Sequence, residues 1–188
     1  MELYYEEFGT GFPLIFLHGN GGNHACFHRQ IAYFRRKFRV IVIDTRGHGR
    51  SPRGTGDFSI SRFADDLYEF FQNHNIEKAN LFGFSDGGNI ALLFAMRHPE
   101  KLQTLRVPTL VLAGTHDIVK TKHSRLIADS LPPAKLALVP GNHSLIRFHA
   151  GKVNRLTDCF FTEKNEKTKD FPKLKKTLAF LLALLYND

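Results

Sequence analysis

The sequence contains no tryptophan and only two cysteines, Cys26 and Cys159, among its 188 residues. Two cysteines cannot build the disulfide framework that stabilises small secreted domains. The longest apolar run, Leu178 to Tyr186, is far shorter than the roughly 20 residues that span a bilayer, so we expect no membrane span. The N-terminus also lacks the basic start and apolar core of a signal peptide, and we therefore expect a cytoplasmic protein.

The formal net charge is +8, and much of the excess lies in residues 29–53. Such an excess can indicate an anionic partner, but no zinc-ligand spacing, RNA-binding motif or helix-turn-helix pattern accompanies it. We interpret these residues as a solvated helix face followed by a basic loop, and we expect no nucleic acid partner. The hydrophobic share of 43% and the 18 phenylalanines predict a single globular domain with an aromatic core made of phenylalanine.

Short apolar runs without polar alternation predict strands that are buried on both faces. They cover residues 14–17, 40–43, 80–84, 109–113 and 135–139, with a possible edge strand at 2–8. Helical patterns lie between them at 24–37, 63–71, 87–97 and 121–131, and Ser59 or Ser61 could cap the second of these. This alternation predicts an α/β fold, with a doubly wound and mostly parallel sheet flanked by helices.

The strand at 80–84 runs into Gly83-Phe84-Ser85-Asp86-Gly87-Gly88, a G-x-S-x-G pattern that opens a helix. A serine on such a tight turn has its hydroxyl exposed at the edge of the sheet, and the glycines let strand and helix approach closely. The pattern predicts a nucleophile at Ser85. The alternative is a glycine-rich turn that only binds an anion.

Another glycine-rich loop, residues 18–23, follows the strand at 14–17. Its backbone N–H groups could hold an oxyanion, with the N–H of Asp86 as a second donor. A phosphate-binding loop does not fit, because neither glycine-rich phosphate motif has this spacing. We expect His18 to brace the loop rather than take part in chemistry.

An acid and a histidine each follow a later strand, in the order Ser85, Asp117, His143. A serine hydroxyl needs an imidazole as base, and the imidazole needs a carboxylate to orient it. We therefore predict Asp117 and His143 as the partners of Ser85. His149 is the weaker candidate for the base. Asp44 and Asp86 are the rival acids, although we expect Asp44 to shape its own loop.

Together these pieces resemble the α/β-hydrolase superfamily, in particular its bacterial esterase, peroxidase-like and aminopeptidase-like members. The resemblance implies Ser85 as nucleophile, His143 as general base, and the amides of Asn20 and Asp86 as the oxyanion hole. It implies no metal and no cofactor. The matching segments are 17–21, 44–51, 83–88, 97–101, 108–117 and 141–143.

The sequence departs from this family after Lys101, where a further central strand and a helical lid would follow. Either the protein is a minimal hydrolase or a segment has been deleted. We expect the strands that end at Phe84 and Ala113 to become neighbours or to leave an unpaired edge. A lidless site should be shallow and wet, which favours short acyl esters or a bulky small-molecule substrate.

We assign residues 1–161 to the hydrolase core, with a closing helix at 144–161. Residues 162–188 add a charged loop and an amphipathic helix at 172–186 within the same domain. That helix could cover the site, form a homodimer or pack on the sheet. The expected function is a serine hydrolase of carboxylic esters, and amide cleavage or acyl transfer to peroxide would use the same residues. The alternative is a catalytically weak or inactive binding protein with this fold.

Overall fold

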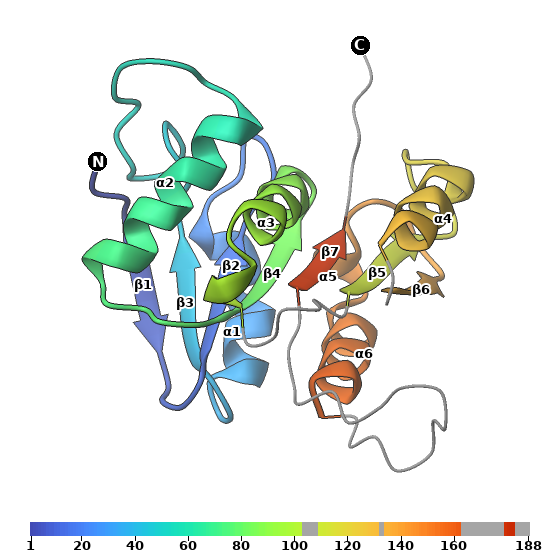
Figure 1. Ribbon diagram of the computed structural model, residues 1–188. Coiled ribbons are helices and arrows are strands. Elements are labelled where there is room, and N and C mark those ends of the chain that lie inside the picture. Colours follow the sequence, from blue (N-terminus) through green and yellow to red (C-terminus); the bar gives the residue numbers. More distant parts are fainter. Residues whose placement is uncertain (103–108, 132–133, 163–178, 183–188) are drawn as a thin grey trace.

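The computed structural model describes residues 1–102, 109–131, 134–162 and 179–182, and within them seven strands form one sheet (Figure 1). The order across the sheet is β1-β3-β2-β4-β7-β5-β6. Every pairing is parallel except that of β1 with β3. The strands are β1 (Tyr5–Phe8), β2 (Pro13–Leu17), β3 (Arg39–Ile43), β4 (Asn80–Phe84), β5 (Thr109–Gly114), β6 (Ala134–Val139) and β7 (Ala179–Leu182).

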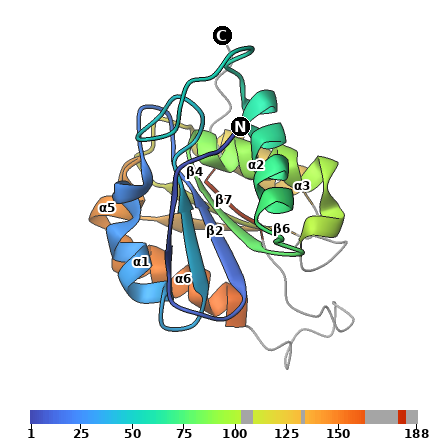
Figure 2. The same cartoon turned by 90° about the vertical axis from the view of Figure 1, so that its left-hand side faces the viewer.

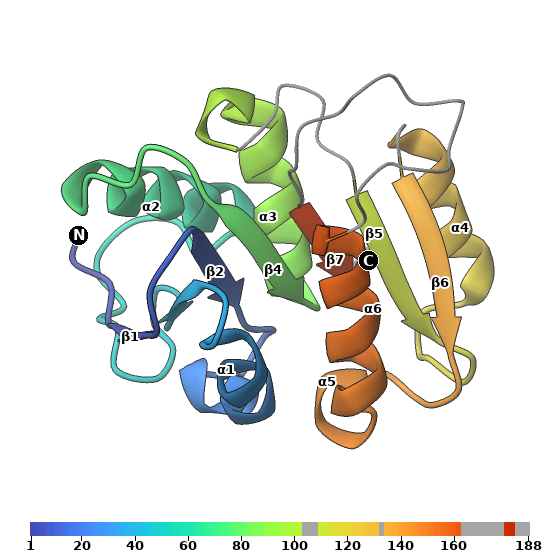
Figure 3. The ribbon, with the colours of Figure 1, turned by 90° about the horizontal axis from the view of Figure 1, so that it is seen from below.

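Helices cover both faces of this sheet (Figures 2 and 3). On one face lie α1 (His28–Phe34), α5 (Leu145–Phe148) and α6 (Ala150–Thr162). On the other face lie α2 (Ile60–Asn73), α3 (Asp86–Arg97) and α4 (Thr121–Ser130). Short 3-10 turns, η1 (His24–Phe27) and η2 (Pro99–Lys101), precede α1 and follow α3. None of the helices in these described segments is both long and apolar enough to cross a bilayer.

Successive side chains of the central strands point to opposite helical layers, as the apolar runs predict. Leu14 and Phe16 of β2 belong to the core beneath α1 and α6, whereas Ile15 and Leu17 belong to the core beneath α2 and α3. Phe16 stacks on Phe82 of β4 with ring centroids 4.6 Å apart. Burying each such side chain contributes about 1.5–3 kcal/mol, so both cores stabilise the sheet. The expectation of a phenylalanine core is confirmed.

The strand and helix predictions within residues 1–162 are largely confirmed. The strands β2 to β6 begin and end within one residue of the predicted ranges. Tyr5–Phe8 is one edge strand and β6 is the other, and β6 is only partly buried, so the expectation of burial on both faces is wrong for it because no described strand covers its outer edge. Ser59 caps α2 by accepting a hydrogen bond from the Arg62 amide. The closing helix divides into α5 and α6 at His149.

The prediction of an amphipathic helix at 172–186 is wrong over Ala179–Leu182, where the chain forms β7. The rest of that range, and the charged loop after Thr162, lie outside the described residues. β7 pairs in parallel with β4 on one side and β5 on the other. A short apolar run is compatible with either a helix or a buried strand, and here two open strand edges decide the choice.

This arrangement also corrects the expectation that the strands ending at Phe84 and Ala113 would be neighbours or leave a bare edge. β7 lies between them, with Phe84 aligned to Leu182 and Leu110 aligned to Phe180. The strand that carries Ser85 and the strand that precedes Asp117 are therefore held one strand apart. The carboxyl ends of these parallel strands meet at one edge of the sheet.

We predict that a chain ending at Thr162 is much less stable than the full chain, because it leaves the facing edges of β4 and β5 unpaired. The expected result is aggregation, or a melting temperature lower by about 10 °C or more. Differential scanning calorimetry measures it.

A chain ending at Leu182 is the matched control, because it keeps β7. Equal stability of the chain ending at Thr162 and this control would contradict the placement of β7 in the sheet. Light scattering on the full chain tests the homodimer, which stays a prediction.

Candidate active site

Ser85 lies on a strained turn between β4 and α3. Its backbone dihedral angles are φ 54° and ψ −123°, a conformation that non-glycine residues adopt at a cost of about 1–3 kcal/mol. A side chain at Gly83 would collide with the Gly87 carbonyl, and one at Gly87 would collide with the Leu17 carbonyl. The glycines of the motif are thus required by close backbone contacts. The predicted strand-to-helix turn at Ser85 is confirmed.

Asp117 and His143 form a hydrogen-bonded pair in the loops after β5 and β6. His143 Nδ1 lies 3.0 Å from Asp117 Oδ1. The same carboxylate accepts hydrogen bonds from the amides of Val119 at 3.1 Å and Gly114 at 3.3 Å. Burial disfavours the charged form of Asp117, but these hydrogen bonds, with that of His143 the largest, hold its pKa below the ordinary value. An ionised carboxylate only accepts, so His143 Nδ1 carries the proton and Nε2 is free to accept one.

The imidazole of His143 packs against the residue that precedes the serine. Its ring centroid lies 5.2 Å from that of Phe84. Within the part of the chain that the structure describes, no hydrogen bond joins the hydroxyl of Ser85 to this imidazole. In free enzymes such contacts are often long and tighten only when substrate binds. The structure therefore brings Asp117 and His143 together, and Ser85 directly follows Phe84, on which the His143 ring packs.

The glycine-rich loop after β2 lies against Ser85. A Cβ atom at Gly19 would lie 2.7 Å from the Cβ of Ser85, so only glycine fits there. Asn20 comes next and is exposed. On the other side of the serine, Asp86 is the first residue of α3, where amide N–H groups have no partner within the helix. Of the two predicted oxyanion donors, Asp86 directly follows Ser85, and Asn20 directly follows Gly19, which lies close to Ser85.

The rival candidates have different surroundings. Asp44 is fully buried and accepts hydrogen bonds from His24 and from the Arg50 amide, which places it in a different group from His143. Asp86 occupies the first turn of α3. His149 is exposed, and its ring lies beside Gly141. Of the predicted pairs, the structure shows Asp117 with His143.

His18 braces the glycine-rich loop, as expected. Its Nε2 accepts a hydrogen bond from the Thr45 amide at 3.0 Å, and its Nδ1 lies 2.7 Å from the Gly19 carbonyl. Burial lowers the pKa of His18, which keeps the ring neutral. Because Nε2 accepts, the proton lies on Nδ1 and is donated to Gly19.

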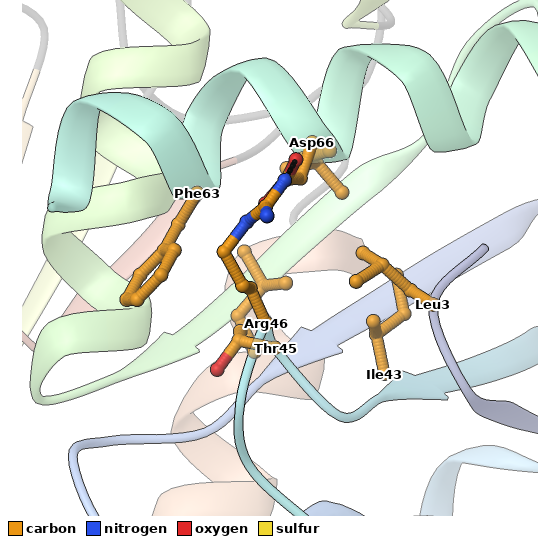
Figure 4. Close-up of a pocket in the computed structure, with 8 residues that line it drawn as sticks. Leu3, Ile43, Thr45, Arg46, Phe63 and Asp66 are labelled. Carbon is orange, nitrogen blue, oxygen red and sulfur yellow. Dashed lines mark hydrogen bonds and ion pairs between the residues drawn. The ribbon is translucent and has the colours of Figure 1, made fainter. Parts of the chain in front are cut away.

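A small pocket at the carboxyl ends of β2 and β3 is lined by a buried ion pair (Figure 4). Arg46 donates to both oxygens of Asp66, at 2.7 and 2.6 Å, and also to the carbonyls of Arg53 and Thr55. The guanidinium is therefore a structural centre of the loop after β3. Our expectation of a solvated basic loop is wrong for Arg46, which is buried, because its charge is neutralised by a carboxylate on α2. No sequence motif links these two positions.

Comparisons with known proteins identify the family of this chain. A family model described as the alpha/beta hydrolase fold matches residues 13–105. The chain belongs to the α/β-hydrolase superfamily. The AB hydrolase superfamily protein YisY of Bacillus subtilis is 40% identical over 99 residues, which are 52% of this chain and 37% of the relative. The pimeloyl-[acyl-carrier protein] methyl ester esterase of Aeromonas hydrophila is 34% identical over 106 residues, which are 56% of this chain and 40% of that enzyme.

Solved structures of this superfamily share the fold over most of the chain. The putative non-heme bromoperoxidase BpoC of Mycobacterium tuberculosis superposes with a TM-score of 0.79 at 19% identity, covering 86% of this chain and 96% of that one. Est816, described as an N-acyl homoserine lactone degrading enzyme, gives 0.76 at 22% identity, covering 84% and 96%. Sequence similarity to the two curated relatives spans about two fifths of their length. Several curated relatives are named for hydrolase or esterase activities.

The two free thiols of this hydrolase-fold chain have different environments: Cys26 is half-buried and Cys159 is exposed. Burial, aided by the negative charge of Asp44, raises the pKa of Cys26 to about 12, whereas Cys159 on α6 is exposed. Only a thiolate attacks disulfide reagents. We predict that Ellman's reagent at about pH 8, near the ordinary thiol pKa, modifies Cys159 rapidly and Cys26 slowly.

Peptide mass spectrometry locates the modified cysteine. In denaturant both thiols should react at similar rates. Rapid modification of Cys26 in the folded protein would show that the loop after β2 is open to solvent.

Proposed function

We propose that this chain is a serine hydrolase that cleaves carboxylic esters through an acyl-enzyme on Ser85. The observation that carries the proposal is the hydrogen bond between Asp117 and His143, at the same sheet edge as a serine on a strained turn. A serine hydroxyl and an imidazole oriented by a carboxylate are the groups that acyl transfer requires. The named activities of several relatives, including methyl ester and enol-lactone hydrolysis, support this class of reaction.

In the proposed reaction, His143 Nε2 takes the proton of the Ser85 hydroxyl while the serine oxygen attacks the ester carbonyl. The carbonyl oxygen becomes negative and is stabilised by the amides of Asn20 and Asp86. His143 then gives its proton to the leaving alkoxide, and an ester of Ser85 remains. Water, deprotonated by the same imidazole, releases the acid and restores the serine. Asp117 stabilises the imidazolium that forms in each half-reaction.

The segment between Lys101 and Thr109 is too short for the helical lid that the resemblance leads us to expect, and this sets the proposed substrate size. We propose small-molecule esters with short acyl chains, or a bulky ester approached from solvent. A series of p-nitrophenyl esters from acetate to palmitate measures this preference.

A second candidate function is that of a catalytically weak or inactive binding protein. It is favoured by one observation: in the described residues the Ser85 hydroxyl makes no hydrogen bond to His143. A fluorophosphonate distinguishes the two, because it labels an activated serine and ignores an inert one.

We predict that Ser85→Ala abolishes both ester hydrolysis and fluorophosphonate labelling while leaving the circular dichroism spectrum unchanged. The reason is that the nucleophile is lost from a turn whose backbone is fixed by its glycines. Ser130→Ala, at the exposed end of α4, is the matched control and should keep full activity. A label that maps to another serine would refute the assignment.

We also predict that Asp117→Asn lowers kcat far more than Asp44→Asn. An asparagine beside His143 would hold the imidazole in the wrong tautomer, which costs about 10⁴ in a comparable triad. Asp44 bonds a different histidine, so its replacement leaves the base intact. Steady-state kinetics with p-nitrophenyl acetate compare the two variants. Equal or reversed effects would transfer the role of the acid to Asp44.

A further inference from the structure

A second carboxylate–histidine pair lies outside the proposed catalytic group. Asp44 follows β3, is fully buried, and accepts two hydrogen bonds from His24: one from the backbone amide at 2.6 Å and one from ring Nδ1 at 2.9 Å. The Arg50 amide donates to the other oxygen at 2.9 Å. Gly49 lies so close to this carboxylate that no side chain would fit there. Nothing in the proposed reaction uses this pair.

His24 stands at one end of the glycine-rich loop after β2, and His18 stands at the other. Residues 19–23, the loop that lies against Ser85, are bracketed by His18 and His24. His18 bonds Thr45 and His24 bonds Asp44, two consecutive residues after β3. Both ends of the loop are thus tied to one point of the neighbouring strand. Within the loop, the Gly22 amide donates to the Gly19 carbonyl at 3.0 Å.

The ring of His24 is not placed for chemistry. Its second nitrogen, Nε2, lies 3.4 Å from a carboxylate oxygen of Glu6, and the ring of Tyr4 packs against it at 5.3 Å between centroids. Both nitrogens therefore face carboxylates on the protein. A histidine held in this way acts as a clamp, since it has no free nitrogen for a substrate proton.

We propose that Asp44 and His24 are positioning residues that hold the 19–23 loop, and with it the Asn20 amide, in register with Ser85. The proposal rests on the proposed serine hydrolase function. An oxyanion donor works only when it is fixed about 2.7–3.1 Å from the position of the developing charge. Since Gly19 already touches Ser85, a small displacement of the loop would move the donor away from this position.

His24→Leu tests the clamp, because leucine fills similar space without a polar atom. We expect kcat for p-nitrophenyl acetate to fall about 10–100-fold with KM nearly unchanged, less than the full loss of an oxyanion donor. Hydrogen exchange followed by mass spectrometry should show faster exchange in peptides covering residues 18–24. This second readout does not depend on activity.

Two matched variants complete the experiment. His24→Asn places an amide N–H near the position of Nδ1 and should restore most of kcat and the slow exchange. Tyr4→Phe removes a hydroxyl that bonds Glu6 and Arg50 in the same cluster, but leaves the bond to Asp44. It should behave like the unaltered protein in both measurements.

The proposal is overturned if His24→Leu changes neither kcat nor exchange beyond about twofold, or if exchange rises while kcat stays constant. It is also overturned if asparagine fails to restore activity or if Tyr4→Phe is equally damaging. Failure of the proposed function looks different: the unaltered chain would neither hydrolyse esters nor take the fluorophosphonate on Ser85. The exchange measurement would then still decide whether His24 holds the loop.

Discussion

The structure depends on a close approach of backbones at the carboxyl end of the central strands. The Leu17 carbonyl lies against Gly87 at the start of α3, and Gly19 lies against Ser85. Any side chain at these glycines would push β2, β4 and α3 apart. The approach forces the unusual backbone angles of Ser85, and the same contacts determine where the loop after β2 can lie. The same backbone contacts therefore position both Ser85 and the loop that holds Asn20.

Sheet continuity is the second constraint on the site. The strand carrying Ser85 and the strand preceding Asp117 do not pair with each other, because β7 lies between them. Its backbone is hydrogen-bonded on both sides, so it sets the separation of the loops that carry Ser85 and Asp117. β7, a segment near the end of the sequence, thereby lies in the middle of the sheet, where it determines the distance between β4 and β5.

Two histidine–carboxylate pairs with similar bonding have different roles because of their surroundings. In the pair of Asp117 and His143, no described residue bonds the second ring nitrogen, and the ring packs beside Phe84, the residue before Ser85. In the pair of Asp44 and His24, the second nitrogen faces Glu6. The residue types are the same in both pairs, so what faces the second ring nitrogen separates a proposed base from a proposed clamp.

The sequence by itself determined the local elements and the candidate residues. Short uninterrupted apolar runs between helical patterns predicted β2 to β6, and the glycines on both sides of Ser85 predicted a tight turn. Tertiary structure decided what depends on distant partners. The apolar run at 179–182 forms a strand because it pairs with the edges of β4 and β5. Arg46 is buried because Asp66 neutralises its charge. His24, after β2, bonds Asp44, which follows the neighbouring strand β3. No local pattern encodes these pairings, since each requires residues far apart in sequence to be brought into contact by the folded sheet.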